Sequence, residues 1–154
     1  MKRETLTEKN LDAKREKGLT WKEIGKTIGG GSPIVITAAL LGQMRLAPAQ
    51  AAKAAKLFGL DKNEAATLTE TPYRGSPPPG PPTDPLIYRF YELVQVYGTT
   101  WKALIEEEFG ENGRPADGIM SAIDFDMTID KVPDPEGDRV KIVMTGKFLH
   151  YKRY

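Results

Sequence analysis

A run of prolines in the middle of the chain limits its fold more than any other feature. Residues 77–82 read Pro-Pro-Pro-Gly-Pro-Pro. Such a run continues neither a helix nor a central strand, because proline lacks the backbone N–H and its ring fixes φ. It favours an extended spacer, although a ligand for a proline-binding domain is the alternative. We therefore divide the 154 residues into an N-terminal domain, 1–76, a proline-rich linker, 77–85, and a C-terminal domain, 86–154.

The segment before the linker carries the start and stop signals of several short helices. Residues 20–23 form a capping-box pattern, and the helix that they open should end at the glycines 29–31. Pro33 and Pro48 suit the first position of two further helices, and a last short helix should begin near Asp61. Short helices joined by a glycine turn are the layout of a helix-turn-helix domain, of which the λ-repressor-like bundle is an example.

The helix in the recognition position argues against DNA binding. A helix that contacts base edges presents polar or basic side chains, whereas residues 33–41 are apolar apart from Thr37. The 22 basic and 21 acidic residues nearly cancel, which is unusual for a nucleic-acid-binding protein. We expect no nucleic-acid partner, and a helix that is buried on most of its surface by packing into an oligomer. A helix-turn-helix DNA-binding regulator with a ligand-binding C-terminal domain is the alternative function.

The segment after the linker begins with helical signals. Asp84 and Pro85 suit the N-cap and the first position of a helix, which should stop at Gly98. A second helix is expected over residues 101–109, followed by a loop over 110–118.

The last third of the chain has the period of β-strands. Apolar and polar residues alternate over 119–130, a turn cluster occupies 133–138, and alternation returns over 140–145. The fold class is therefore α+β, a helical bundle followed by a small helix and β-hairpin domain. Because an isolated hairpin is marginally stable, we expect this domain to complete its sheet with another subunit.

The residue inventory excludes several kinds of chemistry. The chain has no cysteine, which excludes disulfides, thiolate nucleophiles and cysteine zinc sites. The only histidine, His150, is placed after the last predicted strand and is interpreted as a surface residue. Asp124, Asp126 and Asp130 share one side of a strand and are interpreted as solvated, not as metal ligands. Without an apolar leader or a transmembrane-length run, the expected location is cytoplasmic and no membrane partner is expected.

Three polar residues are candidates for a site. Arg89 and Glu92 are three apart on a predicted helix and share a face. Their neighbours over 88–97 are largely aromatic or aliphatic, so we predict a partly buried pair, with a plain surface ion pair as the alternative. Ser121 lies on the more apolar side of the first strand. There it is either a small residue that serves packing alone or part of a site that faces the Arg89 helix. The residues alone predict an oligomer with a candidate anion site and no particular reaction.

Long and specific motifs run in order over nearly the whole chain. They include Tyr-Arg-Phe-Tyr-Glu at 88–92 and Gly-Ile-Met-Ser-Ala-Ile-Asp-Phe at 118–125; the other segments are 35–43, 83–85, 95–100, 102–104 and 134–140. Together they resemble the cyanase family, also called cyanate hydratase or cyanate lyase. Two segments depart from the family pattern: the loop 111–117 is longer, and the end of the chain, 150–154, is more basic.

The resemblance implies a function and an assembly. Members decompose cyanate with bicarbonate to carbon dioxide and carbamate, which breaks down to ammonia and carbon dioxide, without a metal or cofactor. The catalytic set falls on Arg89, Glu92 and Ser121. We expect Arg89 to clamp the anions, Ser121 to donate a hydrogen bond, and Glu92 to orient Arg89 and relay a proton. The family also implies a homodecamer of five dimers, an N-terminal domain used for assembly, interlocked C-terminal segments and active sites between subunits.

Overall fold

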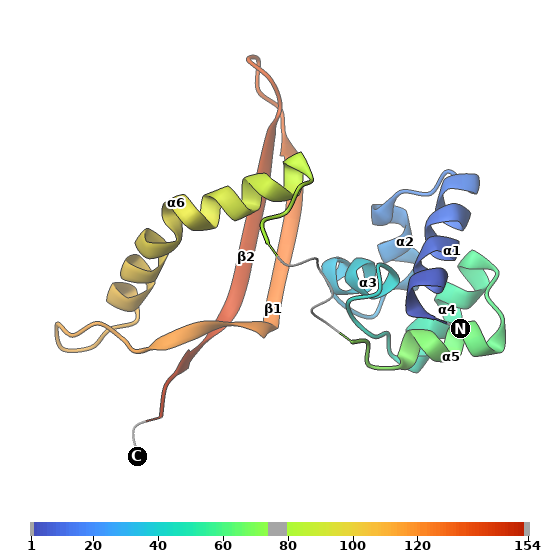
Figure 1. Cartoon of the computed structure of the whole chain (residues 1–154), viewed down its shortest axis with the longest axis horizontal. Coiled ribbons are helices and arrows are strands. Elements are labelled where there is room, and N and C mark those ends of the chain that lie inside the picture. Colours follow the sequence, from blue (N-terminus) through green and yellow to red (C-terminus); the bar gives the residue numbers. More distant parts are fainter. Residues whose placement is uncertain (1, 74–79, 153–154) are drawn as a thin grey trace. The chain divides into compact units, whose positions relative to one another are not determined.

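The computed structural model describes residues 2–73 and 80–152. Within these ranges, six helices precede two strands (Figure 1), which confirms the α+β class. The helices are α1 (Arg3–Glu16), α2 (Trp21–Ile28), α3 (Pro33–Leu40), α4 (Pro48–Phe58), α5 (Lys62–Thr69) and α6 (Pro85–Glu108), and the strands are β1 (Gly118–Val132) and β2 (Arg139–His150). Residues 77–79 of the predicted linker lie outside the described residues, and the domain boundaries stay a prediction.

Two compact units make up the chain. The first contains α1 to α5 together with residues 126–143 of the hairpin, and the second contains α6 with the hairpin residues 118–125 and 144–150.

Helices α1 to α5 form a bundle around one apolar core (Figure 1). The buried core residues are Leu6, Ala13, Ile24, Ile28, Ile36, Ala39, Leu40, Leu46, Ala51, Ala54, Phe58 and Leu68. The capping box at 20–23 is confirmed, because the Glu23 N–H donates to Thr20 Oγ1 over 3.2 Å and the Thr20 N–H donates to Glu23 Oε2 over 2.7 Å. The starts of α3, α4 and α5 also lie where the sequence predicts them. Helix α1 was not predicted individually, because its three leucine and alanine positions are surrounded by charges.

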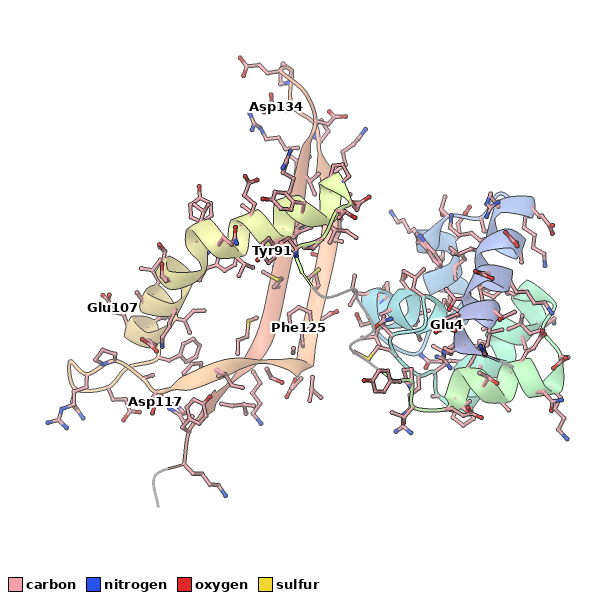
Figure 2. The ribbon with its side chains drawn as sticks, in the orientation of Figure 1. Glu4, Tyr91, Glu107, Asp117, Phe125 and Asp134 are labelled. Atoms are coloured by element: carbon pink, nitrogen blue, oxygen red, sulfur yellow. The ribbon has the colours of Figure 1, made fainter. Side chains whose placement is uncertain are left out.

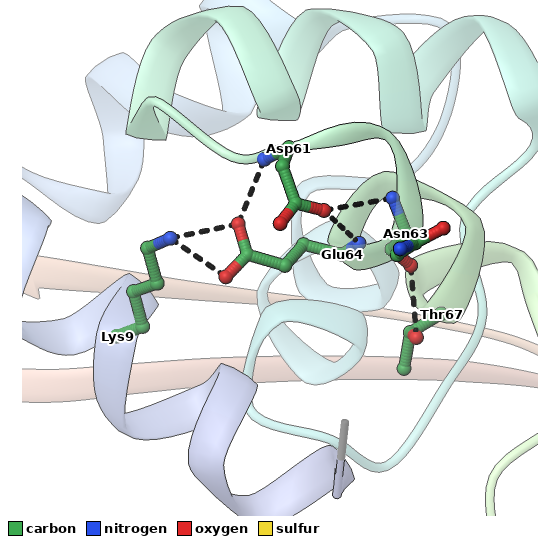
Figure 3. A network of polar contacts seen from close by, with 5 residues as sticks. All are labelled: Lys9, Asp61, Asn63, Glu64 and Thr67. Atoms are coloured by element: carbon green, nitrogen blue, oxygen red, sulfur yellow. Dashed lines mark hydrogen bonds and ion pairs between the residues drawn. The ribbon is translucent and has the colours of Figure 1, made fainter.

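Partly buried polar contacts connect the helices of the bundle. The Arg3 guanidinium donates to the carbonyls of Thr67, Ala39 and Met44, and burial lowers the pKa of Arg3. Lys9 Nζ lies 2.6 and 2.7 Å from the two carboxylate oxygens of Glu64 (Figure 3). These hydrogen bonds from Lys9, and a further one from the backbone N–H of Asp61, hold the pKa of Glu64 below its usual value.

Helix α3 is buried on part of its surface within a single chain. Ile36, Ala39 and Leu40 enter the core, but Val35 is 36% exposed and Leu41 is 40% exposed. The sequence-based prediction was burial by packing into an oligomer, and it stays a prediction.

Helix α6 is one continuous helix where the sequence predicted two. Gly98 lies inside it, and its φ is not positive as it would be at a left-handed C-cap. The helix instead ends at Glu108, and Thr99 and Thr100 are internal positions. Asp84 caps its N-terminus as predicted, with Oδ1 accepting hydrogen bonds from the backbone N–H groups of Leu86 and Ile87 over 3.0 and 2.9 Å.

The hairpin is longer than its sequence pattern indicated. Strand β2 continues to His150, so the placement of His150 after the last strand is wrong. Its ring packs edge-on against Phe148, with 4.8 Å between the ring centroids, and remains exposed at the surface. The turn between the strands is fixed by Asp134, whose carboxylate accepts hydrogen bonds from the Glu136 backbone N–H and from Arg139 Nε.

Candidate active site

The Arg89–Glu92 pair lies on the second turn of α6. The two side chains face each other across one helical turn, with 3.6 Å between Arg89 Nη1 and Glu92 Oε2. Tyr88 flanks the pair, and the Arg89 guanidinium carbon lies 5.8 Å from the centre of its ring. Tyr88 in turn lies 6.0 Å, ring to ring, from Tyr91. The helix thus presents a cation with five N–H donors, a carboxylate and two phenol rings on neighbouring positions.

This pair is exposed within a single chain. The side chains of Arg89 and Glu92 are 64% and 50% exposed, so the prediction of partial burial is wrong for the isolated chain. Apolar neighbours surround the pair as expected, but they are exposed as well, and no residue of α6 is buried. Figure 2 shows side chains projecting from α6 along its length. The exposed large apolar residues of this helix are Leu86, Ile87, Phe90, Tyr91, Leu93, Val94, Val96, Tyr97, Trp101 and Leu104.

Ser121 differs from the pair because it is buried. Its residue exposure is 7%, on strand β1. The hydroxyl oxygen accepts hydrogen bonds from the backbone N–H groups of Ile123 and Asp124, over 3.0 and 2.9 Å. A hydroxyl has two acceptor lone pairs and one donor hydrogen. With both lone pairs engaged, the remaining capacity of Ser121 is to donate.

The structure brings together two of the three predicted residues. Arg89 and Glu92 form an ion pair, whereas the Ser121 hydroxyl bonds only to its own strand within residues 2–73 and 80–152. In one chain the pair and the serine therefore remain separate groups, each with unused hydrogen-bonding capacity.

Two surface depressions lie elsewhere, around the loop after α6. One, of about 500 Å³, is lined by Phe109, Glu111, Asn112, Arg114, Pro115, Ala116 and His150. The other, of about 570 Å³, is lined by Ala103, Glu106, Glu107, Gly110, Gly113, Arg114 and Pro115. Neither includes a predicted site residue. Residues of the loop 111–117 line both depressions.

The described part of the chain shows neither a metal cluster nor a membrane span. None of its His, Asp and Glu side chains gather in threes around a point that could hold a metal ion. None of its helices is long and apolar enough to cross a bilayer.

Comparison with known proteins matches both parts of the chain. The family described as "Cyanate hydratase, N-terminal" matches residues 3–72, and the one described as "Cyanate lyase C-terminal domain" matches residues 79–153. The cyanate hydratases of Ralstonia pickettii and Polynucleobacter asymbioticus are 54% and 53% identical over 154 residues, which is the full length of each protein. The crystal structure of cyanase from T. urticae superposes with a TM-score of 0.77 and 36% identity, covering 94% of this chain and 96% of that chain.

These matches cover the helical bundle as well as α6 and the hairpin. They therefore define the class of the whole α+β chain and not of one part of it. The chain belongs to the cyanate hydratase family, also described as cyanate lyase. The relatives give no support to the alternative of a DNA-binding regulator.

Proposed function

We propose that this protein is a cyanate hydratase that decomposes cyanate with bicarbonate. The observation that carries the proposal is that more than half of the residues are identical, over the full length, to those of proteins named cyanate hydratase. In the proposed reaction, an oxygen of bicarbonate forms a bond to the cyanate carbon, and the cyanate nitrogen receives two protons, one from solvent and one from the hydroxyl of bicarbonate. The bond between that oxygen and the bicarbonate carbon then breaks, which releases carbon dioxide and leaves carbamate. Carbamate takes up a further proton and decays to ammonia and another carbon dioxide.

Both substrates are small anions, so the site must offset their mutual repulsion. At 4 Å two unit charges repel by about 1 kcal/mol in water and by about 4 kcal/mol at a protein surface. Arg89 suits this task because its guanidinium stays charged and offers donors in a fixed planar arrangement. Its position over Tyr88 and beside Glu92 restricts the directions in which it can point. Holding the two anions in contact geometry removes much of the entropic cost of their encounter.

Ser121 is assigned the role of a fixed donor. Its lone pairs accept from the Ile123 and Asp124 N–H groups, so its hydrogen is directed away from its own strand. A donor that is already oriented stabilises negative charge in the transition state without reorganising. Glu92 is assigned two roles: it orients Arg89, and it relays a proton toward the cyanate nitrogen.

The exposed apolar surface of α6 supports an assembly of several chains. Contiguous apolar patches of this kind mark interaction sites in soluble proteins. We propose that the chain forms a homodecamer of five dimers, with interlocked C-terminal segments and active sites between subunits. Such a site would combine the Arg89–Glu92 pair with a Ser121 from another chain. We also propose a cytoplasmic enzyme that uses bicarbonate as co-substrate and needs neither metal nor organic cofactor.

Site variants test the assignment. Arg89→Ala and Ser121→Ala should each lower the kcat/KM for cyanate by about 100-fold or more, because each removes a preorganised donor. Lys102→Ala is the matched control, since the exposed Lys102 also forms an intrahelical ion pair on α6, with Glu106. It should leave kcat/KM within about 2-fold, as expected for a surface pair. Equal losses in all three variants would refute the site, and cyanate left unconsumed by the unaltered protein would refute the function.

A further inference from the structure

Gly146 of β2 packs directly against the backbone of Ser121. A Cβ atom on Gly146 would lie 2.5 Å from the Ser121 carbonyl oxygen and 2.6 Å from Met120 Cγ. Both separations are shorter than the van der Waals contact distance, for the carbon–oxygen pair and for the carbon–carbon pair. The carbonyl is part of a strand and cannot rotate away like the end of a long side chain. Position 146 therefore has no room for a side chain unless Ser121 moves.

Space, and not backbone conformation, requires the glycine at this position. Gly146 does not have a positive φ, so alanine can adopt its backbone angles. Gly137 in the hairpin turn is different, because its φ of 124° is one that side chains disfavour. Replacing Gly146 by alanine would therefore act through the contact with β1 rather than through local backbone strain.

Movement of the Ser121 backbone would carry its hydroxyl with it. The hydroxyl is oriented by the N–H groups of Ile123 and Asp124, which belong to the same short stretch of β1. If the backbone of this stretch is displaced, both the position of Ser121 Oγ and the direction of its hydrogen change. Displacement of a catalytic group by about 1 Å can cost about 100-fold in rate.

We propose that Gly146 is a positioning residue: its missing side chain lets β2 hold Ser121 where the serine hydroxyl donates to the reacting anions. This inference rests on the proposed function, in which Ser121 is a donor. Gly146 itself touches no substrate in this account and acts only through Ser121.

A double-mutant cycle tests the proposal by steady-state ammonia release from cyanate with bicarbonate. Gly146→Ala should lower kcat/KM by about 100-fold when Ser121 is present. In a Ser121→Ala background the same substitution should change kcat/KM by less than about 3-fold, because the group that it misplaces is already gone. Circular dichroism and sedimentation of each variant establish that the assembled fold is retained.

Gly118→Ala is the matched control in the same hairpin. Its Cβ would lie 2.4 Å from the Leu149 carbonyl oxygen and 2.7 Å from the Phe148 ring, but not against Ser121. It should change kcat/KM by the same factor in both backgrounds, as an independent perturbation does.

Two results would overturn the positioning role. One is an equal loss for Gly146→Ala with and without Ser121, and the other is a Gly146→Ala protein that fails to fold while Gly118→Ala folds. A Ser121→Ala protein as active as the unaltered one would instead remove the proposed role of Ser121, and this inference with it.

Discussion

At the scale of single residues, the proposed catalysis depends on the shape of the Arg89 side chain as well as on its charge. A guanidinium donates through a rigid planar fork, whereas an ammonium is a compact point charge. If Arg89 holds two anions in contact, Arg89→Lys should keep the charge but lose most of the catalysis, with kcat/KM reduced by about 10- to 100-fold. Steady-state kinetics over cyanate and bicarbonate concentrations measure this loss. A lysine variant with unaltered kcat/KM would show that charge alone suffices at this position.

Glu64 leads to a prediction about pH and stability. Its pKa is lowered in the folded protein, first by the hydrogen bond from Lys9 and then by the Asp61 backbone N–H. Its contribution to stability is therefore fully present above the ordinary glutamate pKa of about 4.3, and is lost as the pH falls through the lower folded value. Glu64→Gln should melt at a lower temperature than the unaltered protein at pH 6, and the difference should shrink toward pH 3.

Thermal unfolding monitored by circular dichroism between pH 3 and 6, at one protein concentration, checks this behaviour. Glu8→Gln, at an exposed position of α1, is the control for the loss of one carboxylate. A melting difference that stays constant or grows on acidification would contradict the role of the Lys9–Glu64 contact.

The sequence predicted the pairing of Arg89 with Glu92 better than the surroundings of the pair. Spacing placed Arg89 and Glu92 on one face of a helix, and the structure joins them as an ion pair. The predicted burial failed because it was inferred from apolar neighbours, and those neighbours are themselves exposed in a single chain. The hydrogen bonds that fix the Ser121 hydroxyl could not be predicted, because strand alternation does not reveal where backbone N–H groups turn toward a side chain.

At the scale of secondary-structure elements, the N-cap of α6 supports the helix that carries the pair. Asp84 Oδ1 accepts from two backbone N–H groups that have no partner within the helix. Asp84→Ala should lower the free energy of unfolding by about 1 kcal/mol. Asp84→Ser should recover most of this loss, because serine is also a favourable N-cap. Denaturant titration at fixed protein concentration provides the measurement, and an alanine variant as stable as the serine variant would contradict the capping role.

Gly98 shows why some element boundaries could not be predicted. Glycine followed by two threonines resembles a helix end and a new N-cap. Inside a helix, the same glycine costs about 1 kcal/mol relative to alanine, which the hydrogen bonds of an uninterrupted 24-residue helix offset. By contrast, the boundaries around Thr20, Pro33, Pro48 and Asp61 could be predicted because cap and proline signals coincide there with the start of an apolar pattern.

At the scale of the whole molecule, the two groups of the candidate site are left apart and an apolar helix is left uncovered. If active sites lie between subunits, Arg89 and Ser121 of one site come from different chains. Co-expressing Arg89→Ala and Ser121→Ala chains should then restore activity, up to about one quarter of the native value for random pairing into two-fold symmetric dimers. Each mixed dimer would contain one site with both substitutions and one with neither.

Ammonia release from the purified mixed assembly, compared with each variant alone, measures this complementation. Mixed assemblies no more active than the separate variants would place Arg89 and Ser121 of each site in the same chain. The apolar residues of α6 could be read from the sequence, but their exposure in a single chain could not, because burial was inferred from their apolar character alone.

The most direct test of the central claim is ammonia release from cyanate by the full-length protein, measured in carbon-dioxide-free buffer with and without added bicarbonate. We predict that ammonia appears only when bicarbonate is added, and that two molecules of carbon dioxide form for each cyanate consumed. Ammonia formed at the same rate without bicarbonate, or none formed by the folded assembly in its presence, would contradict the proposed reaction.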